Sequence, residues 1–287
     1  MCTDDRGYIT AKYLQFVEVF SKTKAETVAP HLSIDDTIDI EPSYQLPYQR
    51  TYNLSHIELR THKAHIDTQL ANGLIQQLAS MTAAPIVFAN MTDGGLRLSV
   101  DYLALNKSTI ENRYPLPLIW EMLDRLCGAC IITKLDLQNA YHLIRNKQGD
   151  EYKRAFRIRY SQFKYRVIPF GLTNTQATFQ SYIDDCLQPS IDDFAVCYLD
   201  DISIHSTHEK EHKEHVHKEL GRLREIGLYC KAEMCQFGVS EVSFIGFVIN
   251  SDRIGMDWDR IATIEDLPTP TTLRDVQVLL RFANFYW

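Results

Sequence analysis

The segment Ala195–Ile204 constrains the fold of this chain more than any other stretch. It reads Ala-Val-Cys-Tyr-Leu-Asp-Asp-Ile-Ser-Ile, so a mostly apolar run leads into Asp200 and Asp201 and an alternating run leads out. Apolar runs on both sides of turn-forming residues predict a β-hairpin with paired carboxylates at its tip. Two adjacent acids repel each other, which indicates a divalent cation nearby. A tight turn without any chemistry is the alternative interpretation of these residues.

A further carboxylate, Asp136, stands near the end of the mostly apolar run Cys130–Leu137. A carboxylate at the end of a buried strand is a common metal ligand. It is equally common as the N-cap of a following helix. The local sequence leaves both interpretations open.

The rest of the sequence predicts both helices and strands. Two capping boxes, Ser55 with Glu58 and Ser206 with Glu209, each predict the start of a helix. Arg97 alternates with apolar neighbours, so we expect it to project from one face of a strand. The predicted helices cover residues 55–71, 118–126, 174–187, 206–226 and a last segment from 272, and the predicted strands are hairpins over 85–102 and 154–168 and a single strand over 242–249.

The cysteines and the apolar runs indicate in which compartment the chain acts and whether it holds a structural zinc ion. The seven cysteines are scattered through apolar segments, which favours reduced thiols inside a cell. Cys127 and Cys130 have metal-ligand spacing, but a closed zinc site needs two more ligands and no second such pair exists. No apolar run approaches the roughly 20 residues that span a bilayer, so we expect no membrane association. The expected localisation is the cytoplasm or the nucleus, with the mitochondrion as a further alternative.

Nine segments form a constellation whose order and spacing resemble the reverse transcriptase of Ty3/Gypsy-type long-terminal-repeat retrotransposons, in a fungal-like form. They are, in order, Gly94–Tyr102, Leu105–Lys107, Arg113–Pro117, Lys134–His142, Gly149–Asp150, Pro169–Asn174, Ala177–Gln180, Tyr198–Asp201 and Phe244–Gly246. The resemblance runs from about residue 16 to the end of the chain.

This resemblance implies an α+β fold of the right-hand polymerase type, with fingers, a palm built on an antiparallel sheet, and part of a thumb or connection. The implied boundaries are an extended lead-in over 1–54, mainly fingers over 55–130, mainly palm over 131–250 with a fingers hairpin near 154–168, and the start of the thumb over 251–287. The family pattern continues into ribonuclease H and integrase regions, which we expect to be encoded elsewhere, so the chain is expected to be truncated.

The resemblance also implies the site residues. Asp136 and Asp200 are expected to bind two Mg²⁺ ions, for which Mn²⁺ is a possible substitute, and Asp201 is the accessory carboxylate. The other implied roles are triphosphate contact for Arg97, backbone contact to the same phosphates for Asn139 and Ala140, exclusion of ribose for Tyr141, lining of the nucleotide pocket for Phe170 and Gly171, and primer binding for Ile245 and Gly246. The implied partners are an RNA template, a DNA primer or template, and deoxynucleoside triphosphates.

Two features of the chain depart from what such an enzyme needs. A lysine run that the family usually carries is replaced by Asn90, Met91 and Thr92, which removes positive charge from the predicted fingers. The 30 Lys and Arg residues stand against 37 Asp and Glu residues, a net charge of −7, although phosphate neutralisation provides most affinity for nucleic acid. Two functions therefore remain: an RNA-directed DNA polymerase, or a decayed or co-opted relic that keeps the fold and at most binds nucleic acid.

Overall fold

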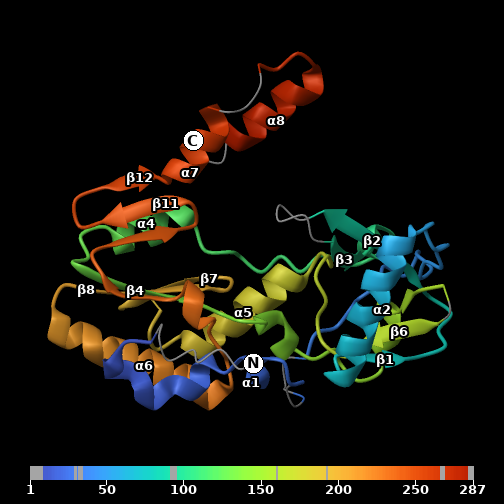
Figure 1. The fold of residues 1–287 in the computed structure, drawn as a ribbon, viewed down its shortest axis with the longest axis horizontal. Helices are drawn as coiled ribbons and strands as arrows, with labels where there is room; N and C mark the ends of the chain where they lie inside the picture. The colour runs from blue at the N-terminus through green and yellow to red at the C-terminus, as the bar shows by residue number, and fades with distance from the viewer. Residues whose placement is uncertain are drawn as a thin grey trace.

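The computed structural model describes residues 9–28, 31, 35–90, 96–159, 161–191, 193–265 and 269–283. Its larger lobe, which we call the palm lobe, is built on a four-stranded antiparallel sheet in the order β7-β8-β4-β9 (Figure 1). These strands are β4 (Ile131–Asp136), β7 (Ala195–Tyr198), β8 (Asp201–Ser206) and β9 (Gln236–Val239). The apolar segments that predicted strands therefore lie side by side.

Alternating side chains of the palm strands build two cores. On one face, Leu135, Ile202 and Ile204 pack with α5 (Thr175–Leu187), α6 (Glu209–Ile226) and the 3-10 helix η2 (Ala11–Phe20). On the opposite face, Ile132 and Val196 pack with α4 (Ile119–Leu126) and a small sheet of β10 (Glu241–Phe244), β11 (Phe247–Asn250) and β12 (Ile254–Met256). This period-two division is what a strand buried on both faces requires.

The second lobe, the fingers lobe, contains a five-stranded sheet in the order β1-β6-β5-β2-β3. Only the β2–β5 pair of this sheet is parallel. Helix α2 (His56–Ala71) lies beside this sheet, and its predicted capping box is present between Ser55 and Glu58 (Figure 1). The strands are β1 (Ile75–Gln77), β2 (Ala84–Asn90), β3 (Leu96–Val100), β5 (Phe156–Arg157) and β6 (Gln162–Tyr165).

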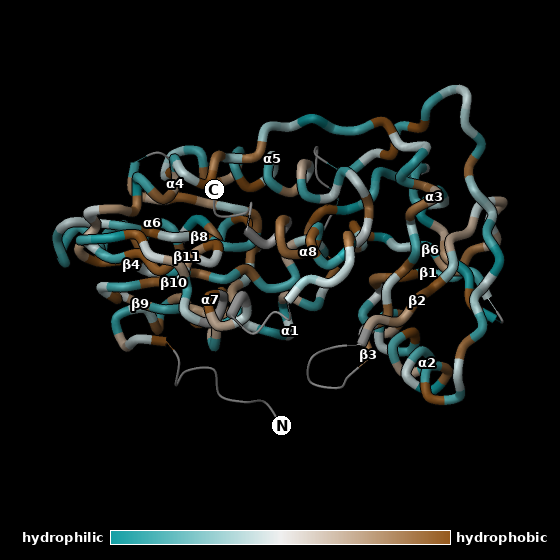
Figure 2. Tube along the Cα trace, turned by 90° about the horizontal axis from the view of Figure 1, so that it is seen from above, coloured by the Kyte–Doolittle hydropathy of each residue, from teal (hydrophilic) through white to brown (hydrophobic). Residues whose placement is uncertain are grey.

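Short elements complete the chain. They are α1 (Lys22–Ala25), α3 (Leu103–Asn106), η3 (Ala140–Leu143), η4 (Glu151–Arg154), η5 (Ala232–Met234), α7 (Trp258–Glu265) and α8 (Leu273–Ala283). Helix α8 rises away from the palm lobe (Figure 1), and the view from above shows hydrophobic segments recurring along both lobes (Figure 2). None of the helices in the described ranges has the length and apolar character that crossing a membrane demands.

Two local predictions are wrong. The segment predicted as one strand over 242–249 is a hairpin, because Ile245 and Gly246 have positive φ values of 51° and 82° and turn the chain between β10 and β11. Ser206 does not cap α6, whose N-cap is His208 without a side-chain hydrogen bond. The Ser206 hydroxyl instead hydrogen-bonds to His212 and His215 at 3.0 and 2.9 Å.

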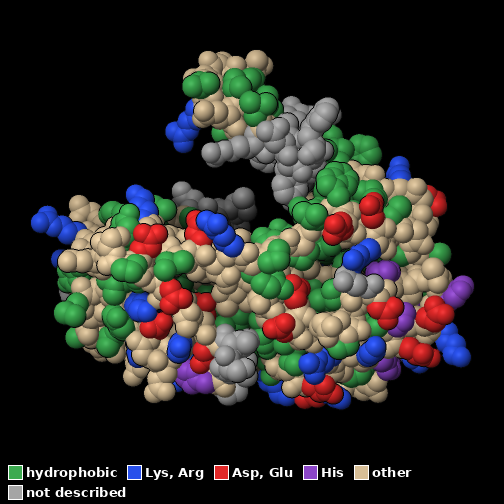
Figure 3. Space-filling view, turned by 180° about the vertical axis from the view of Figure 1, so that it is seen from behind, with side chains coloured by type: hydrophobic (Ala, Val, Ile, Leu, Met, Phe, Trp, Pro, Cys, Tyr) green, Lys and Arg blue, Asp and Glu red, His purple; other side chains and the backbone are tan. Residues whose placement is uncertain are grey.

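The 154–168 hairpin forms as predicted, and three of its basic residues have partners within the chain. Arg154 is buried and pairs with Asp36, and Lys164 pairs with Glu151. Arg157 lies over the Tyr48 ring, 4.8 Å from its centroid. On the face seen in Figure 3, acidic and basic side chains are interspersed over the surface.

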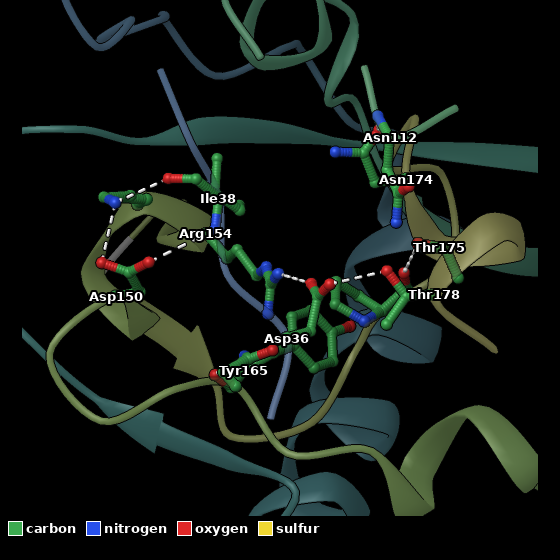
Figure 4. A network of polar contacts seen from close by, with 12 residues as sticks. Asp36, Ile38, Asn112, Asp150, Arg154, Tyr165, Asn174, Thr175 and Thr178 are labelled. Atoms are coloured by element: carbon green, nitrogen blue, oxygen red, sulfur yellow. Dashed lines mark hydrogen bonds and ion pairs between the residues drawn. The ribbon is translucent and has the colours of Figure 1, made fainter. Parts of the chain in front are cut away.

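A polar network joins three parts of the chain (Figure 4). Asp36, from the N-terminal segment, pairs with Arg154 of η4 and accepts a hydrogen bond of 2.9 Å from Thr178 of α5. Nearby, the backbone of Ile38 contacts both Asp150 and Lys153. The N-terminal segment is therefore fastened to the fingers and the palm at once.

Candidate active site

The register of β4 and β8 makes Asp136, Asp200 and Asp201 neighbours along the backbone. Asp136 lies directly opposite Asp201, and the backbone N–H of Leu137 donates to the carbonyl of Asp200 at 2.8 Å. Asp136 is thus the last residue of a strand rather than a helix N-cap. Residues far apart in the sequence become neighbours through antiparallel pairing alone.

The β7–β8 hairpin forms as predicted, with one correction. Tyr198 pairs with Asp201, so the two-residue turn consists of Leu199 and Asp200, and Asp201 is already the first residue of β8. Leu199 has a φ of +54°, which a residue with a Cβ rarely adopts. Asp200 therefore lies in the turn and Asp201 in the strand, so their side chains extend from different backbone environments.

A side chain that the sequence patterns did not single out supports this turn. The amide of Gln180, which is fully buried on α5, accepts a hydrogen bond from the Leu199 N–H at 2.8 Å and donates to the Cys197 carbonyl at 3.2 Å. Buried amides of this kind fix the conformation of the backbone they contact. The only sequence signal was its place in the segment Ala177–Gln180.

Burial and mutual repulsion of the negative charges raise the pKa values of two of the carboxylates, Asp136 and Asp200. The pKa of Asp136 is raised to about 6, first by burial and then by the charges of Asp201 and Asp200. The pKa of Asp200 is also raised, by desolvation of its carboxyl and then by Asp201, although the residue as a whole is exposed. Lys134 partly compensates, because its Nζ lies 2.9 Å from Oδ1 of Asp201.

This donor chemistry fits Mg²⁺. Within the ranges described, no three His, Cys, Asp or Glu side chains are gathered as a ready-made metal site. The fit rests instead on oxygen donors, which hard cations prefer, and on the unfavourable charge that a cation beside Asp136 and Asp200 relieves.

Tyr141 lies beside the carboxylates. It belongs to η3, which starts after Asn139 in a left-handed conformation with a φ of 51°. The Tyr141 side chain is 9% exposed and packs against Phe179 and Phe170, with ring centroids 4.5 and 5.1 Å away. Burial, followed by the nearby charge of Asp200, raises the pKa of Tyr141 to about 12. The structure therefore places Tyr141 beside Phe170 and near Asp200, and the roles of these residues stay predictions.

The Phe170–Gly171 segment is held by Asn106, a second residue whose role the sequence patterns did not show. The Asn106 amide donates to the Gly171 carbonyl at 2.8 Å and accepts from the Thr173 N–H at 3.0 Å. Gly171 has a φ of +97°, which explains a glycine there. Phe170 lines a cavity of about 330 Å³ together with residues of α2 and β3.

The remaining predicted contacts are those of Arg97 with the triphosphate and of Ile245 and Gly246 with the primer. Arg97 lies in β3 opposite Ala89, but its side chain and residues 91–95 are outside the described part of the structure, so its triphosphate contact stays a prediction. Ile245 and Gly246 form the β10–β11 turn, and the adjacent strand β10 approaches β4 where Lys134 donates to the Ser243 carbonyl at 3.2 Å.

Comparisons with known proteins agree with this geometry. The family model described as "Reverse transcriptase (RNA-dependent DNA polymerase)" matches residues 90–249. Two polyproteins of Schizosaccharomyces pombe, from transposons Tf2-3 and Tf2-7, are each 34% identical over 95% of this chain, which spans 21% of their length.

Solved structures match the fold. A foamy viral protease-reverse transcriptase in complex with double-stranded DNA superposes with a TM-score of 0.85 at 21% identity, over 100% of this chain and 59% of that one. The same kind of protein in complex with an RNA/DNA hybrid gives a TM-score of 0.84 at 20% identity, over 99% of this chain and 38% of that one. The right-hand polymerase fold is confirmed, and the chain belongs to the reverse transcriptase (RNA-dependent DNA polymerase) family.

Proposed function

We propose that this chain extends a DNA primer on an RNA or DNA template by nucleotidyl transfer. One observation carries the proposal: β4–β8 pairing sets Asp136 opposite Asp201 and beside Asp200, with Tyr141 close enough for the charge of Asp200 to raise its pKa. Carboxylates placed in this way serve metal-dependent phosphoryl transfer.

Each residue of the site has a proposed task. Asp136 and Asp200 would hold Mg²⁺, with Mn²⁺ as a substitute. Asp201, which forms an ion pair with Lys134, would be the accessory carboxylate and contribute to the electrostatic potential of the site. Bound Mg²⁺ supplies a lowered pKa for the primer 3′-hydroxyl and stabilisation of the leaving pyrophosphate. The backbone N–H groups of Asn139 and Ala140 bind phosphate oxygens, as successive N–H groups do at other anion sites.

Around the nucleotide, Tyr141 excludes a ribose 2′-hydroxyl with its ring, Phe170 and Gly171 line the sugar and base pocket, and Arg97 contacts the triphosphate. The turn formed by Ile245 and Gly246 holds the primer. The well-packed position of Tyr141 against Phe179 supports its role, because a steric filter has to be rigid.

The proposed partners are an RNA template, a DNA primer or template, and deoxynucleoside triphosphates. The titles of the foamy viral structures name double-stranded DNA and an RNA/DNA hybrid as what those proteins bind. Because this chain spans about a fifth of the Tf2 polyproteins, we propose that ribonuclease H and integrase activities lie in other regions. Its proposed place of action is inside the cell, in a cytoplasmic particle or the nucleus.

Primer extension on an RNA template, with Mg²⁺ and deoxynucleotides, tests the proposal. The unaltered chain should extend the primer, and Asp200→Asn should lower the rate by at least about a hundredfold, because charged oxygen ligands of the ion are lost. Equal rates for both proteins contradict the proposal. Measurable duplex binding without extension supports the relic instead, which the net charge of −7 and the segment Asn90–Thr92 favour.

A further inference from the structure

Lys134 occupies an unusual place on the catalytic strand. It lies two residues before Asp136 on β4, opposite Ser203 of β8 and Gln236 of β9, so strands on both sides fix its backbone. By the alternation of the strand, its side chain shares the face of Ile132, which belongs to the apolar cluster beneath β10 and β11. Only 18% of the Lys134 side chain is exposed. Partial burial of a charge requires strong partners.

Its two partners come from different elements. The Lys134 ammonium lies 2.9 Å from Oδ1 of Asp201 and donates a hydrogen bond of 3.2 Å to the backbone carbonyl of Ser243 in β10. A compact ammonium group with three donors can donate to the Ser243 carbonyl while it stays within ion-pair distance of Asp201. Lys134 thus joins the catalytic carboxylates to the β10–β11 hairpin.

The contact continues beyond Ser243. The Ser243 hydroxyl donates to Oδ2 of Asp257 at 2.7 Å, and the Asp257 N–H donates to the carbonyl of Gly246 at 3.2 Å. Asp257 directly precedes α7. A continuous series of contacts therefore runs from Asp201 through Lys134 to the Ile245–Gly246 turn and the base of α7.

Charge compensation alone does not explain this arrangement. Lys231 also contributes positive charge near Asp136, but its side chain is 43% exposed and its ammonium pairs with Glu233 at 3.9 Å. The two lysines therefore share the electrostatic effect on Asp136. The contact with the hairpin backbone is a feature of Lys134 that a mere counter-charge does not require.

We propose that Lys134 is a positioning residue, which fixes the Ile245–Gly246 turn relative to Asp201 so that the primer 3′ end meets the carboxylates. This inference rests on the proposed function, which places the primer at that turn. It assigns Lys134 a role in the alignment of the primer rather than in the chemical step.

Fluorescence of 2-aminopurine at the primer 3′ terminus tests the inference without turnover. The probe is a primer–template duplex bound in Ca²⁺, and the signal rises when the terminal base unstacks. Lys134→Met keeps the length and the apolar stem and should raise the signal about twofold or more. Lys231→Met, the matched control, should give the wild-type signal because it leaves the hairpin contact in place. Duplex affinity should change by less than about threefold for either variant, since each removes one charge.

Kinetics add a second readout. In Mg²⁺, Lys134→Met should lower kcat about tenfold or more, the effect of losing a charge-assisted hydrogen bond, while KM for the deoxynucleotide stays within about twofold. Thermal unfolding followed by circular dichroism verifies that the variant is folded. If Lys134→Met does not fold, Lys134→Arg replaces it, because it keeps the charge but not the compact ammonium head. A raised 2-aminopurine fluorescence in Lys134→Arg supports the positioning role, and wild-type fluorescence overturns it.

The outcomes separate the two proposals. A wild-type chain that extends primers, with Lys134→Met indistinguishable from Lys231→Met in the terminal signal, overturns the positioning role alone. A wild-type chain that binds the duplex without extending it contradicts the proposed activity, while the fluorescence comparison still decides the role of Lys134. A wild-type chain that binds no duplex overturns both.

Discussion

The carboxyl of Asp136 shows how a site selected for binding a cation opposes folding. Its pKa in the folded chain is about 6, against 3.8 for an ordinary aspartate, because of burial and two neighbouring carboxylates. A raised pKa in the folded state stabilises the fold below pH 3.8, and this contribution is lost as the pH rises through 6. At pH 7, without metal, ionised Asp136 therefore reduces the stability of the chain.

Asp136→Asn should accordingly stabilise the metal-free chain at pH 7 while it abolishes primer extension. A shift of about two pKa units corresponds to about 3 kcal/mol, which partial solvent exposure reduces to about 1–2 kcal/mol. Urea unfolding in the presence of a chelator measures the difference. Asp124→Asn, at an exposed position of α4, is the control and should change stability by less than about 0.5 kcal/mol. A less stable Asp136→Asn protein contradicts this account.

Tyr141 provides a second prediction at the scale of one residue. If its ring excludes the ribose 2′-hydroxyl, Tyr141→Ala should raise ribonucleotide incorporation relative to deoxynucleotide incorporation by about tenfold or more, because a steric clash is removed. Tyr141→Phe keeps the ring and its contacts with Phe170 and Phe179, so it should discriminate like the unaltered chain. The measurement is the ratio of kcat/KM values for the two nucleotides. An unchanged ratio in Tyr141→Ala removes the sugar-filter role.

At the scale of elements, α6 is attached to the catalytic sheet by a buried histidine. His212 is 3% exposed, and its ring nitrogens lie 2.7 Å from the hydroxyl of Thr133 in β4 and 3.0 Å from that of Ser206 in β8. Burial, and then the neighbouring His215 and His205, lower its pKa to about 4 from 6.5. The neutral ring is therefore part of the folded state.

Stability should fall as the pH decreases from 6.5 towards 4, because the unfolded chain binds a proton at His212 that the folded chain resists. The shift predicts a loss of about 2–3 kcal/mol in the free energy of unfolding over that range. His212→Gln retains hydrogen-bonding groups but does not titrate. The pH dependence of urea unfolding should thus be weaker in this variant than in the parent chain, and identical profiles would exclude His212 as the cause.

The sequence predicted elements where the signal was local. The capping box at Ser55 marks α2, and the apolar runs around Asp136 and Asp200 mark the strands that pair in the site. It did not predict the β10–β11 turn, because a β-branched residue such as Ile245 rarely takes a positive φ. It misassigned Ser206 because the hydroxyl is used by His212 and His215, a tertiary contact that no capping pattern contains.

At the scale of the whole molecule, long-range contacts decide what local patterns cannot. The segment from Ile9 to Phe20 contains the short helix η2, and it packs into the palm core together with α6. Gln180 and Asn106 likewise act on loops distant in the sequence. The site is thus positioned by buried polar side chains whose partners only the fold supplies.

We expect the Asp36–Arg154 pair to stabilise the contact between the two lobes. The side chains are 7% and 1% exposed, and the Thr178 hydroxyl of the palm lobe also donates to Asp36 (Figure 4). The Tyr102 hydroxyl of the fingers lobe donates to the Arg154 carbonyl. Arg154→Met leaves Asp36 as an unpaired buried charge, which costs about 3–5 kcal/mol. The double variant Asp36→Leu with Arg154→Met removes both charges and should be more stable than Arg154→Met alone.

Urea unfolding of the four proteins of this double-mutant cycle measures the coupling between the two residues. Lys24→Met, which breaks an exposed pair with Glu18 at 3.0 Å, is the control and should have a far smaller effect, since water screens that pair. Additive effects of the two single substitutions would show that Asp36 and Arg154 do not depend on each other. A large coupling shows that Asp36 and Arg154 stabilise the fold as a pair, at the point where Asp36 also accepts a hydrogen bond from Thr178 of the palm lobe.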